Sequence, residues 1–313
     1  MHPAFSVIFF TVSSGAGFGL FALLVIADLA GLGGGLRTLY LVGGGMLALV
    51  MIAAGLMSSV FHLANPKNAW RAFSRFRTSW LSREGVFAMG FFPLALIYLA
   101  LTWLQIDSLE WLRVAFALAA LALAWITIFS TAMIYACLKT IRQWNTPLVP
   151  ASYVLLGHFS GAMLLLLIAQ LSGAALLPYL ILVSMLLVSA AFIKGIYYFW
   201  IAKPSVASTI NTATGFTRAR VRLLDAGHTH GTFLTDEFGF VVARRYVVLL
   251  RSLFFVLAFV VPAAIIAGAF GDYGFTGLAL AAAFALVGTV VERWLFFAEA
   301  RHVVNLFHGL QAC

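Results

Sequence analysis

Residues 85–104 read GVFAMGFFPLALIYLALTWL, an unbroken run of 20 residues without a charged side chain. A helix needs about 20 mostly apolar residues to cross the hydrocarbon core of a bilayer. The run is therefore long enough to span a membrane, and we predict a transmembrane helix here. Glu84 stands directly before it, at the expected opening of the span.

Seven further apolar runs of comparable length are spread along the chain. They occupy residues 5–28, 39–62, 112–137, 150–171, 176–201, 246–270 and 275–300. Of the 313 residues 63% are hydrophobic and 9% are charged, whereas about a quarter of the residues of a soluble domain are charged. No soluble fold could cover so much apolar surface. The sequence predicts an all-α integral membrane protein, a bundle of about eight transmembrane helices that forms one polytopic domain over residues 1–313.

Basic residues are distributed unevenly between the predicted loops. The loops after the second, fourth and sixth runs share one side of the membrane and hold 13 Lys and Arg residues, whereas the opposite loops hold two, Arg37 and Arg113. Because basic loops stay in the cytoplasm, we predict that this side and both termini are cytoplasmic. The net charge of +9 therefore does not indicate a nucleic-acid partner. Two cysteines, Cys137 and Cys313, predict neither a disulfide framework nor a metal site.

One predicted loop, residues 203–245, is too long for a simple connection. It mixes basic residues with the polar stretch from His228 to Gly231. Two interpretations are open, a solvated loop or a docking surface for a soluble partner on the cytoplasmic face. The arginines that we expect at such a surface lie in this loop and in the loop after the second run: Arg71, Arg75, Arg77, Arg218, Arg220 and Arg222.

Gly15 and Gly19 are four residues apart inside the first run. This spacing lets a second helix approach closely. The segment lacks the glycine spacing of a dinucleotide-binding loop, and no strand precedes it. We therefore predict close helix packing at these glycines and no phosphate site.

Ionisable residues in the predicted spans gather near the basic side. His62 closes the second span, and His158 lies about two turns inside the fifth. A charge within the bilayer is costly and by default marks a functional site. Long basic side chains can instead reach the lipid headgroups. Such snorkelling is the simpler interpretation for Lys194, Arg251, Arg293 and Arg301.

His62 and Glu84 have a shorter reach and can carry protons, since imidazole titrates near neutral pH and a neighbouring carboxylate can exchange its proton. A quinone has an apolar ring and tail and two carbonyl oxygens, and its redox cycle moves two electrons and two protons. Its site needs an apolar cleft, a few convergent polar groups and a proton route to water. A polar cluster just below one membrane face meets these needs, although His62 alone could also be a packed interfacial histidine.

Two other functions fit the pattern less well. Haem b usually takes a pair of axial histidines on facing helices, and His158 has no good second ligand in the predicted spans, so we expect no haem. Secondary transporters have broken helices and polar residues at the midplane. The middles of these spans are almost wholly apolar, and transport is kept as an alternative only.

Three segments resemble the membrane anchor subunits of DMSO-reductase-type molybdoenzymes. They are the start from Met1 to Gly17, the run from Phe61-His62-Leu63 to Ser82-Arg83-Glu84, and the tail from Glu292-Arg293-Trp294 to Asn305. The resemblance covers the whole chain and its eight-span layout, and the second segment is its most specific part.

This resemblance implies a three-subunit enzyme of the bacterial inner membrane. A large subunit would carry the molybdenum cofactor and a small subunit four iron–sulfur clusters, while the anchor would exchange electrons with ubiquinone or menaquinone. By the resemblance, His62 matches the family's quinol-site histidine, and Glu84 matches a carboxylate important for quinol oxidation. We also expect His158 and Trp80 at the quinone site, although Trp80 could instead belong to the interfacial aromatic belt.

The predicted orientation bears on the substrate of the complex. If the loop between His62 and Glu84 is cytoplasmic, catalytic subunits docked beside it are cytoplasmic too. This looks like the sulfite dehydrogenase branch, in which sulfite is oxidised and electrons enter the quinone pool. The alternative is a quinol-oxidising anchor for sulfoxide or N-oxide reduction.

Overall fold

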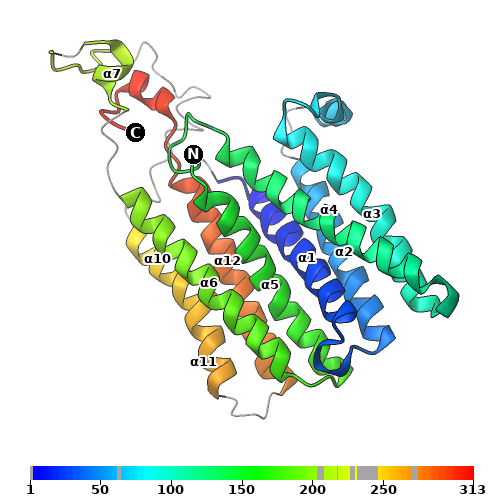
Figure 1. Cartoon of the computed structure of the whole chain (residues 1–313). Helices are drawn as coiled ribbons and strands as arrows, with labels where there is room; N and C mark the ends of the chain where they lie inside the picture. The colour runs from blue at the N-terminus through cyan, green and yellow to red at the C-terminus, as the bar shows by residue number, and fades with distance from the viewer. Residues whose placement is uncertain are drawn as a thin grey trace.

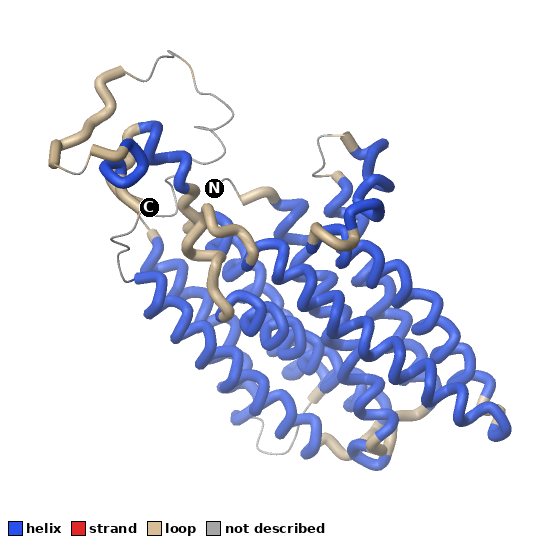
Figure 2. Tube along the Cα trace, turned by 45° about the horizontal axis from the view of Figure 1, so that its top comes forward, coloured by secondary structure: helices blue, strands red, loops and turns tan. Residues whose placement is uncertain are grey.

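The structure is a computed structural model that describes residues 3–61, 65–202, 208–216, 218–225, 230, 246–268 and 274–313. Within these residues eight helical segments are long and apolar enough to cross a membrane. Figure 2 shows helices joined by loops, and the described part of the chain contains no strand beyond two isolated bridges. The predicted all-α membrane fold is confirmed.

The eight spans lie close to the predicted runs. Seven are single helices: α1 (Phe5–Leu29), α2 (Thr38–Val60), α3 (Trp80–Leu104), α4 (Glu110–Ala136), α5 (Leu148–Ser172), α6 (Leu177–Ala202) and α12 (Phe275–Ala298). The remaining span joins α10 (Val247–Phe255), the π-helical turn η4 (Val256–Val260) and α11 (Val261–Gly268). Short helices lie outside the spans: η1 (Leu32–Gly34), η2 (Pro66–Arg75), η3 (Asp107–Leu109), α7 (Ile210–Thr214) and η5 (Val303–His308).

The start of α3 differs from the prediction. The helix begins at Trp80, because the Ser79 side chain caps it by accepting a hydrogen bond from the Ser82 N–H. The polar residues that precede the apolar run thus form its first turns. Glu84 lies inside the helix rather than at its opening.

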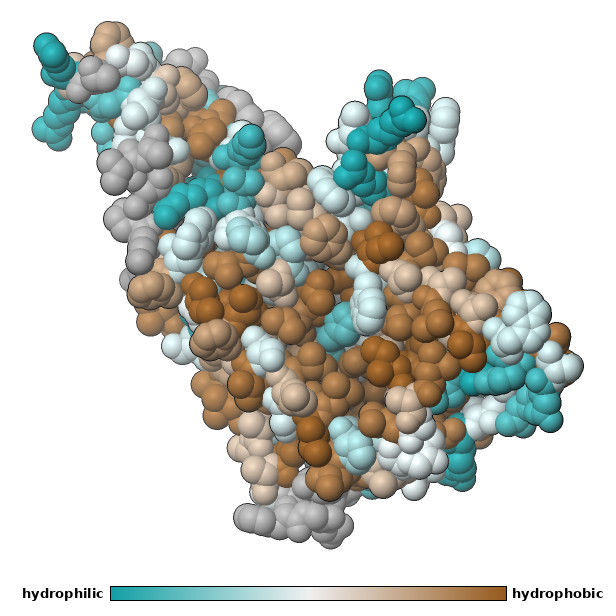
Figure 3. Space-filling view, in the orientation of Figure 1, coloured by the Kyte–Doolittle hydropathy of each residue, from teal (hydrophilic) through white to brown (hydrophobic). Residues whose placement is uncertain are grey.

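Helix α1 lies at the centre of the bundle. It packs against α2, α4, α5 and α12, while α3 pairs with α4 and α6 with α5 (Figure 1). The outward sides of the helices carry large exposed apolar residues, and Figure 3 shows them as a broad hydrophobic band. Such a band needs lipid as its solvent.

Glycines let α1 and α5 approach at backbone distance. A Cβ on Gly19 would lie 2.1 Å from the Gly157 carbonyl oxygen, and a Cβ on Gly161 would lie 2.2 Å from the Leu20 nitrogen. One turn away, a Cβ on Gly15 would lie 4.0 Å from the Gly157 Cα. The predicted packing role of Gly15 and Gly19 is confirmed.

Both ends of the described chain lie at the same end of the bundle, which we call the terminal face (Figure 1). Two projections stand on it. The first is η2, beside α3 and α4. The second combines α7, the segment 218–225 and the C-terminal residues, which are joined by a bridge between Thr209 and Ala312. The loops after α2, α4 and α6 leave from this face, and its assignment to the cytoplasm stays a prediction.

Candidate functional site

Glu84 is a buried carboxyl group in the second turn of α3, with 4% of the residue exposed. Its Oε1 lies 2.5 Å from the Thr131 hydroxyl of α4, and the same hydroxyl lies 3.0 Å from the Thr127 carbonyl oxygen. Since a hydroxyl has one proton to donate, it can serve only one of these two acceptors at a time. When Glu84 is ionised, Thr131 donates to it. When Glu84 is protonated, Glu84 donates to Thr131, which donates to Thr127. The site therefore accommodates both protonation states.

The projection η2 covers the region around Glu84. A Cβ on Gly85 would lie 3.2 Å from Phe73 of η2, and the rings of Phe76 and Phe87 meet edge to face at 5.5 Å. Gly85 thus makes room for an aromatic lid directly beside the carboxyl group. No pattern in the sequence predicts this contact, because it depends on how η2 folds back on α3.

Trp80, one turn before Glu84, is half-buried. Its ring meets Phe129 of α4 at 5.9 Å, and the Arg83 guanidinium lies 4.3 Å from the ring centroid. These contacts place Trp80 at the α3–α4 edge, on the side of the bundle that carries Glu84. Its predicted place at a quinone pocket and the alternative interfacial role stay predictions. His62 falls outside the described residues, and its pairing with Glu84 stays a prediction too.

His158 in α5 is buried, with both ring nitrogens in hydrogen bonds. Its Nε2 accepts from the Trp125 indole N–H at 2.9 Å, and its Nδ1 lies 2.8 Å from the Val154 carbonyl oxygen. Because indole can only donate, Nε2 is the acceptor and Nδ1 carries the proton. This neutral imidazole joins α5 to α4. Its assignment to the quinone site stays a prediction.

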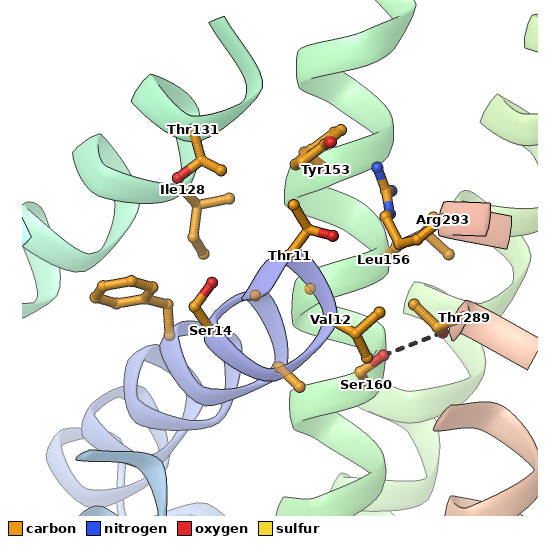
Figure 4. A pocket seen from close by; sticks show the side chains of 14 residues that line it. Thr11, Val12, Ser14, Ile128, Thr131, Tyr153, Leu156, Ser160, Thr289 and Arg293 are labelled. Carbon is orange, nitrogen blue, oxygen red and sulfur yellow. Dashed lines mark hydrogen bonds between the residues drawn. The ribbon is translucent and has the colours of Figure 1, made fainter. Parts of the chain in front are cut away.

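A narrow crevice lies between α1, α4, α5 and α12, and Figure 4 shows its lining. The space has room for about one water molecule. Hydroxyl groups line much of it, and the Arg293 side chain closes one side: Thr11, Ser14, Thr131, Tyr153, Ser160 and Thr289. The Glu84 partner Thr131 is among them, so the crevice begins beside the Glu84 carboxyl group.

Beyond Arg293 lies a buried cluster of charges, which we call the triad: Lys194, Glu292 and Arg293. The Lys194 Nζ lies 2.5 Å from the Glu292 Oε1, and the Arg293 Nε lies 2.7 Å from the Glu292 Oε2. The three side chains are at most 3% exposed. Snorkelling is therefore the wrong interpretation for Lys194 and Arg293, because both turn into the bundle toward a carboxylate.

Arg251 and Arg301 behave differently from the triad. Arg251 is half-buried and pairs with Glu299 near the end of α12, so it also turns to a protein partner rather than only to lipid. Arg301 is exposed on the terminal face. The missed signal for the pairs was opposite charge at similar depth in separate spans, since charges inside a membrane usually pair with one another.

The buried polar groups form one layer across the bundle. Glu84, Thr131, Tyr153, Arg293 and Lys194 each lie within about two turns of the terminal-face end of their helix. This confirms the expected crowding of polar residues into the half of the spans next to the basic loops.

A family model described as the DMSO reductase anchor subunit (DmsC) matches residues 1–310 of this chain. The chain belongs to the DmsC family. A relative of this DmsC-family protein, one of the subunits of the sulfite dehydrogenase of Allochromatium vinosum, is 35% identical over 326 aligned residues, which cover 98% of this chain and 99% of the relative. No solved structure matches the chain.

Membership in the DmsC family makes this protein a multi-pass membrane anchor of a molybdoenzyme complex, with catalytic and electron-transfer subunits as its class of partner. The family resemblance predicted from the sequence is confirmed. Membership also favours the anchor function over the transport alternative.

Proposed function

We propose that this DmsC-family protein passes electrons between an iron–sulfur partner subunit and the quinone pool, and that Glu84 exchanges protons with the quinone. The supporting observation is the Glu84 carboxyl group, which is buried in a span yet has a hydroxyl partner suited to both of its protonation states. A quinone that gains two electrons must also gain two protons. A carboxyl group that can change state without losing its hydrogen bond can supply one of them.

We infer that the complex oxidises sulfite in the cytoplasm and delivers the electrons to quinone. The support is the whole-length similarity to a sulfite dehydrogenase subunit, together with the basic loops expected on the cytoplasmic side. The description of the family model favours the other direction, in which the anchor oxidises quinol for DMSO or N-oxide reduction. The sequence of the catalytic partner distinguishes the two, because a twin-arginine export signal on it would contradict cytoplasmic sulfite oxidation.

Replacement of the Glu84 carboxyl group tests its role. In membranes that contain the assembled complex, Glu84→Gln should lower quinone-linked turnover about 100-fold, as expected for loss of a positioned proton donor. Reduction of an artificial dye by the catalytic subunits should stay unchanged, and His62→Ala should behave in the same way. The matched control is Glu110→Gln at the opposite end of the bundle, with a carboxyl side chain that is 55% exposed. Equal loss of both activities would indicate an assembly role for Glu84.

Purification in mild detergent tests the complex itself. We expect molybdenum and iron to copurify with the chain, without a haem Soret band. A chain that purifies alone and without metal would contradict the anchor function. A Soret band would make His158 the first residue to replace.

We infer that the iron–sulfur partner docks on the terminal face between the two projections. Figure 3 shows a recess between them in this orientation, with hydrophilic residues on both sides. The six arginines predicted for docking divide between the projections and are all exposed: Arg71, Arg75 and Arg77 on and beside η2, and Arg218, Arg220 and Arg222 on the other. A partner with an acidic surface would meet basic groups on both flanks.

Two triple variants test this arrangement, each serving as the other's comparison. Replacing Arg71, Arg75 and Arg77 by Ser, or Arg218, Arg220 and Arg222 by Ser, should release more of the partner from membranes as salt is raised, because salt screens exposed charges. The two sets combined should release more than either alone. Full retention of the partner by the combined variant would rule out both projections as the dock. The remainder of the predicted docking loop, over residues 203–245, lies largely outside the described residues.

A further inference from the structure

The crevice connects Glu84 to the triad. At one end, Thr131 lines the crevice and holds the Glu84 carboxyl group at 2.5 Å. At the other end, Tyr153 and Arg293 line both the crevice and a smaller void that also touches Lys194 and Glu292. These two residues are thus the common wall between the Glu84 side and the triad side. Glu84 and Glu292 both influence the Tyr153 hydroxyl electrostatically.

Polar atoms at this wall need a further partner. Among the described residues, the Tyr153 hydroxyl and the Arg293 Nη1 have no hydrogen-bond partner, although both atoms are buried. The Arg293 guanidinium lies 3.8 Å from the centroid of the Tyr153 ring, and Figure 4 shows the two side chains together at one side of the crevice. A buried polar atom without a partner is costly. The crevice beside them has room for about one water, and a water held by such groups is a normal part of a protein structure.

We propose that a water in this crevice, together with the Tyr153 hydroxyl, carries protons between Glu84 and the Lys194–Glu292 pair. The inference rests on the proposed proton-exchange function of Glu84 and adds the route by which that group is recharged. Thr131, Tyr153, Glu292 and Lys194 become relay residues, while Arg293 positions the water. Arginine does not itself give up a proton in a protein.

The proton count along this route balances. During quinone reduction the electrons come from the iron–sulfur partner, and Glu84 gives its proton to a reduced quinone oxygen. The Thr131 hydroxyl, the crevice water and the Tyr153 hydroxyl each pass one proton on and receive one, so they end unchanged. Glu292 supplies the proton at the far end and takes one from Lys194. Lys194 is then reprotonated from the terminal face, where the Arg251–Glu299 pair lies. Quinol oxidation would run the same transfers in reverse.

The Tyr153→Phe variant tests the relay in the whole complex, because it removes one hydroxyl and keeps the ring beneath Arg293. We expect quinone-linked turnover to fall about 10- to 100-fold, within or just below the range of a positioned proton donor. The loss should deepen as pH rises, and the solvent deuterium isotope effect should increase, because proton supply then limits the rate. Dye-linked turnover should not change.

The matched control is Tyr179→Phe, which removes another tyrosine hydroxyl near the opposite end of the bundle, where it donates to the Leu32 carbonyl oxygen at 2.8 Å. Lys194→Met is a second relay variant and should reproduce the Tyr153→Phe pH profile. If Tyr153→Phe and Lys194→Met both keep the normal quinone rate and pH profile while Glu84→Gln loses activity, the relay is wrong and the proposed function stands. If Glu84→Gln keeps full activity, the proton-exchange function and the relay both fall.

Discussion

The Lys194 ammonium group lies 2.5 Å from a carboxylate oxygen of Glu292, and neither side chain is more than 1% exposed. The other carboxylate oxygen lies 2.7 Å from the Arg293 Nε. One carboxylate therefore balances two cations, and the triad holds an excess of one positive charge. Buried charges are tolerated only when they are paired, so the loss of each member should have a different cost.

Glu292→Gln should be the most damaging change in the triad. It leaves two buried cations without a counter-charge, and breaking a buried pair in this way costs about 3–5 kcal/mol. Lys194→Met should cost far less, because it leaves a neutral Glu292–Arg293 pair. The two variants are to be compared by the free energy of unfolding in mixed micelles. Equal destabilisation would show that Lys194 is not the surplus cation.

Thr131→Val should impair quinone turnover while Thr131→Ser should not. Valine keeps the branched shape but removes the hydroxyl that holds Glu84 and lines the crevice. Loss of a hydrogen bond to a charged group costs about 1.5–3 kcal/mol, and we expect quinone-linked turnover to fall about tenfold or more. The ratio of quinone-linked to dye-linked rates measures the effect. A serine variant as impaired as the valine variant would indicate that the methyl group, rather than the hydroxyl, matters here.

Gly19→Val should disrupt the packing of α1 on α5. The new Cβ would lie 2.1 Å from a backbone oxygen that cannot rotate away, so the helices must separate. Overpacking typically costs about 1–3 kcal/mol, and a backbone clash in the central helix should reach the upper end. Gly43→Val in α2 is the matched control, because its Cβ meets nothing within 4 Å. Thermal unfolding in detergent should separate the two variants, and equal midpoints would contradict the close approach.

Reporter fusions should place the terminal face in the cytoplasm. The side that holds 13 of the loop Lys and Arg residues is retained there by the positive-inside rule. A fluorescent protein fused after Cys313 should therefore fluoresce, and alkaline phosphatase fused after Gly35 should be active. The reverse result would invert the orientation and remove the argument for cytoplasmic sulfite oxidation.

The sequence by itself determined the number of spans, the side that carries the basic loops and the depth of Glu84. Each of these follows from local properties, because the length of an apolar run decides whether it can cross a bilayer and the flanking charges mark its ends. The capped first turns of α3 were missed, since the polar residues from Ser79 to Glu84 look like loop until the helix is seen to continue through them.

Only the tertiary structure decided which polar groups meet. Lys194 and Glu292 are 98 residues apart, and Glu84 and Thr131 are 47 apart. Their contacts depend on how each helix is rotated about its axis and on the close approach that glycines allow between α1 and α5. Hydropathy sets the depth of a residue but does not set that rotation. For this reason a lysine that could have reached the lipid headgroups lies instead in a buried triad.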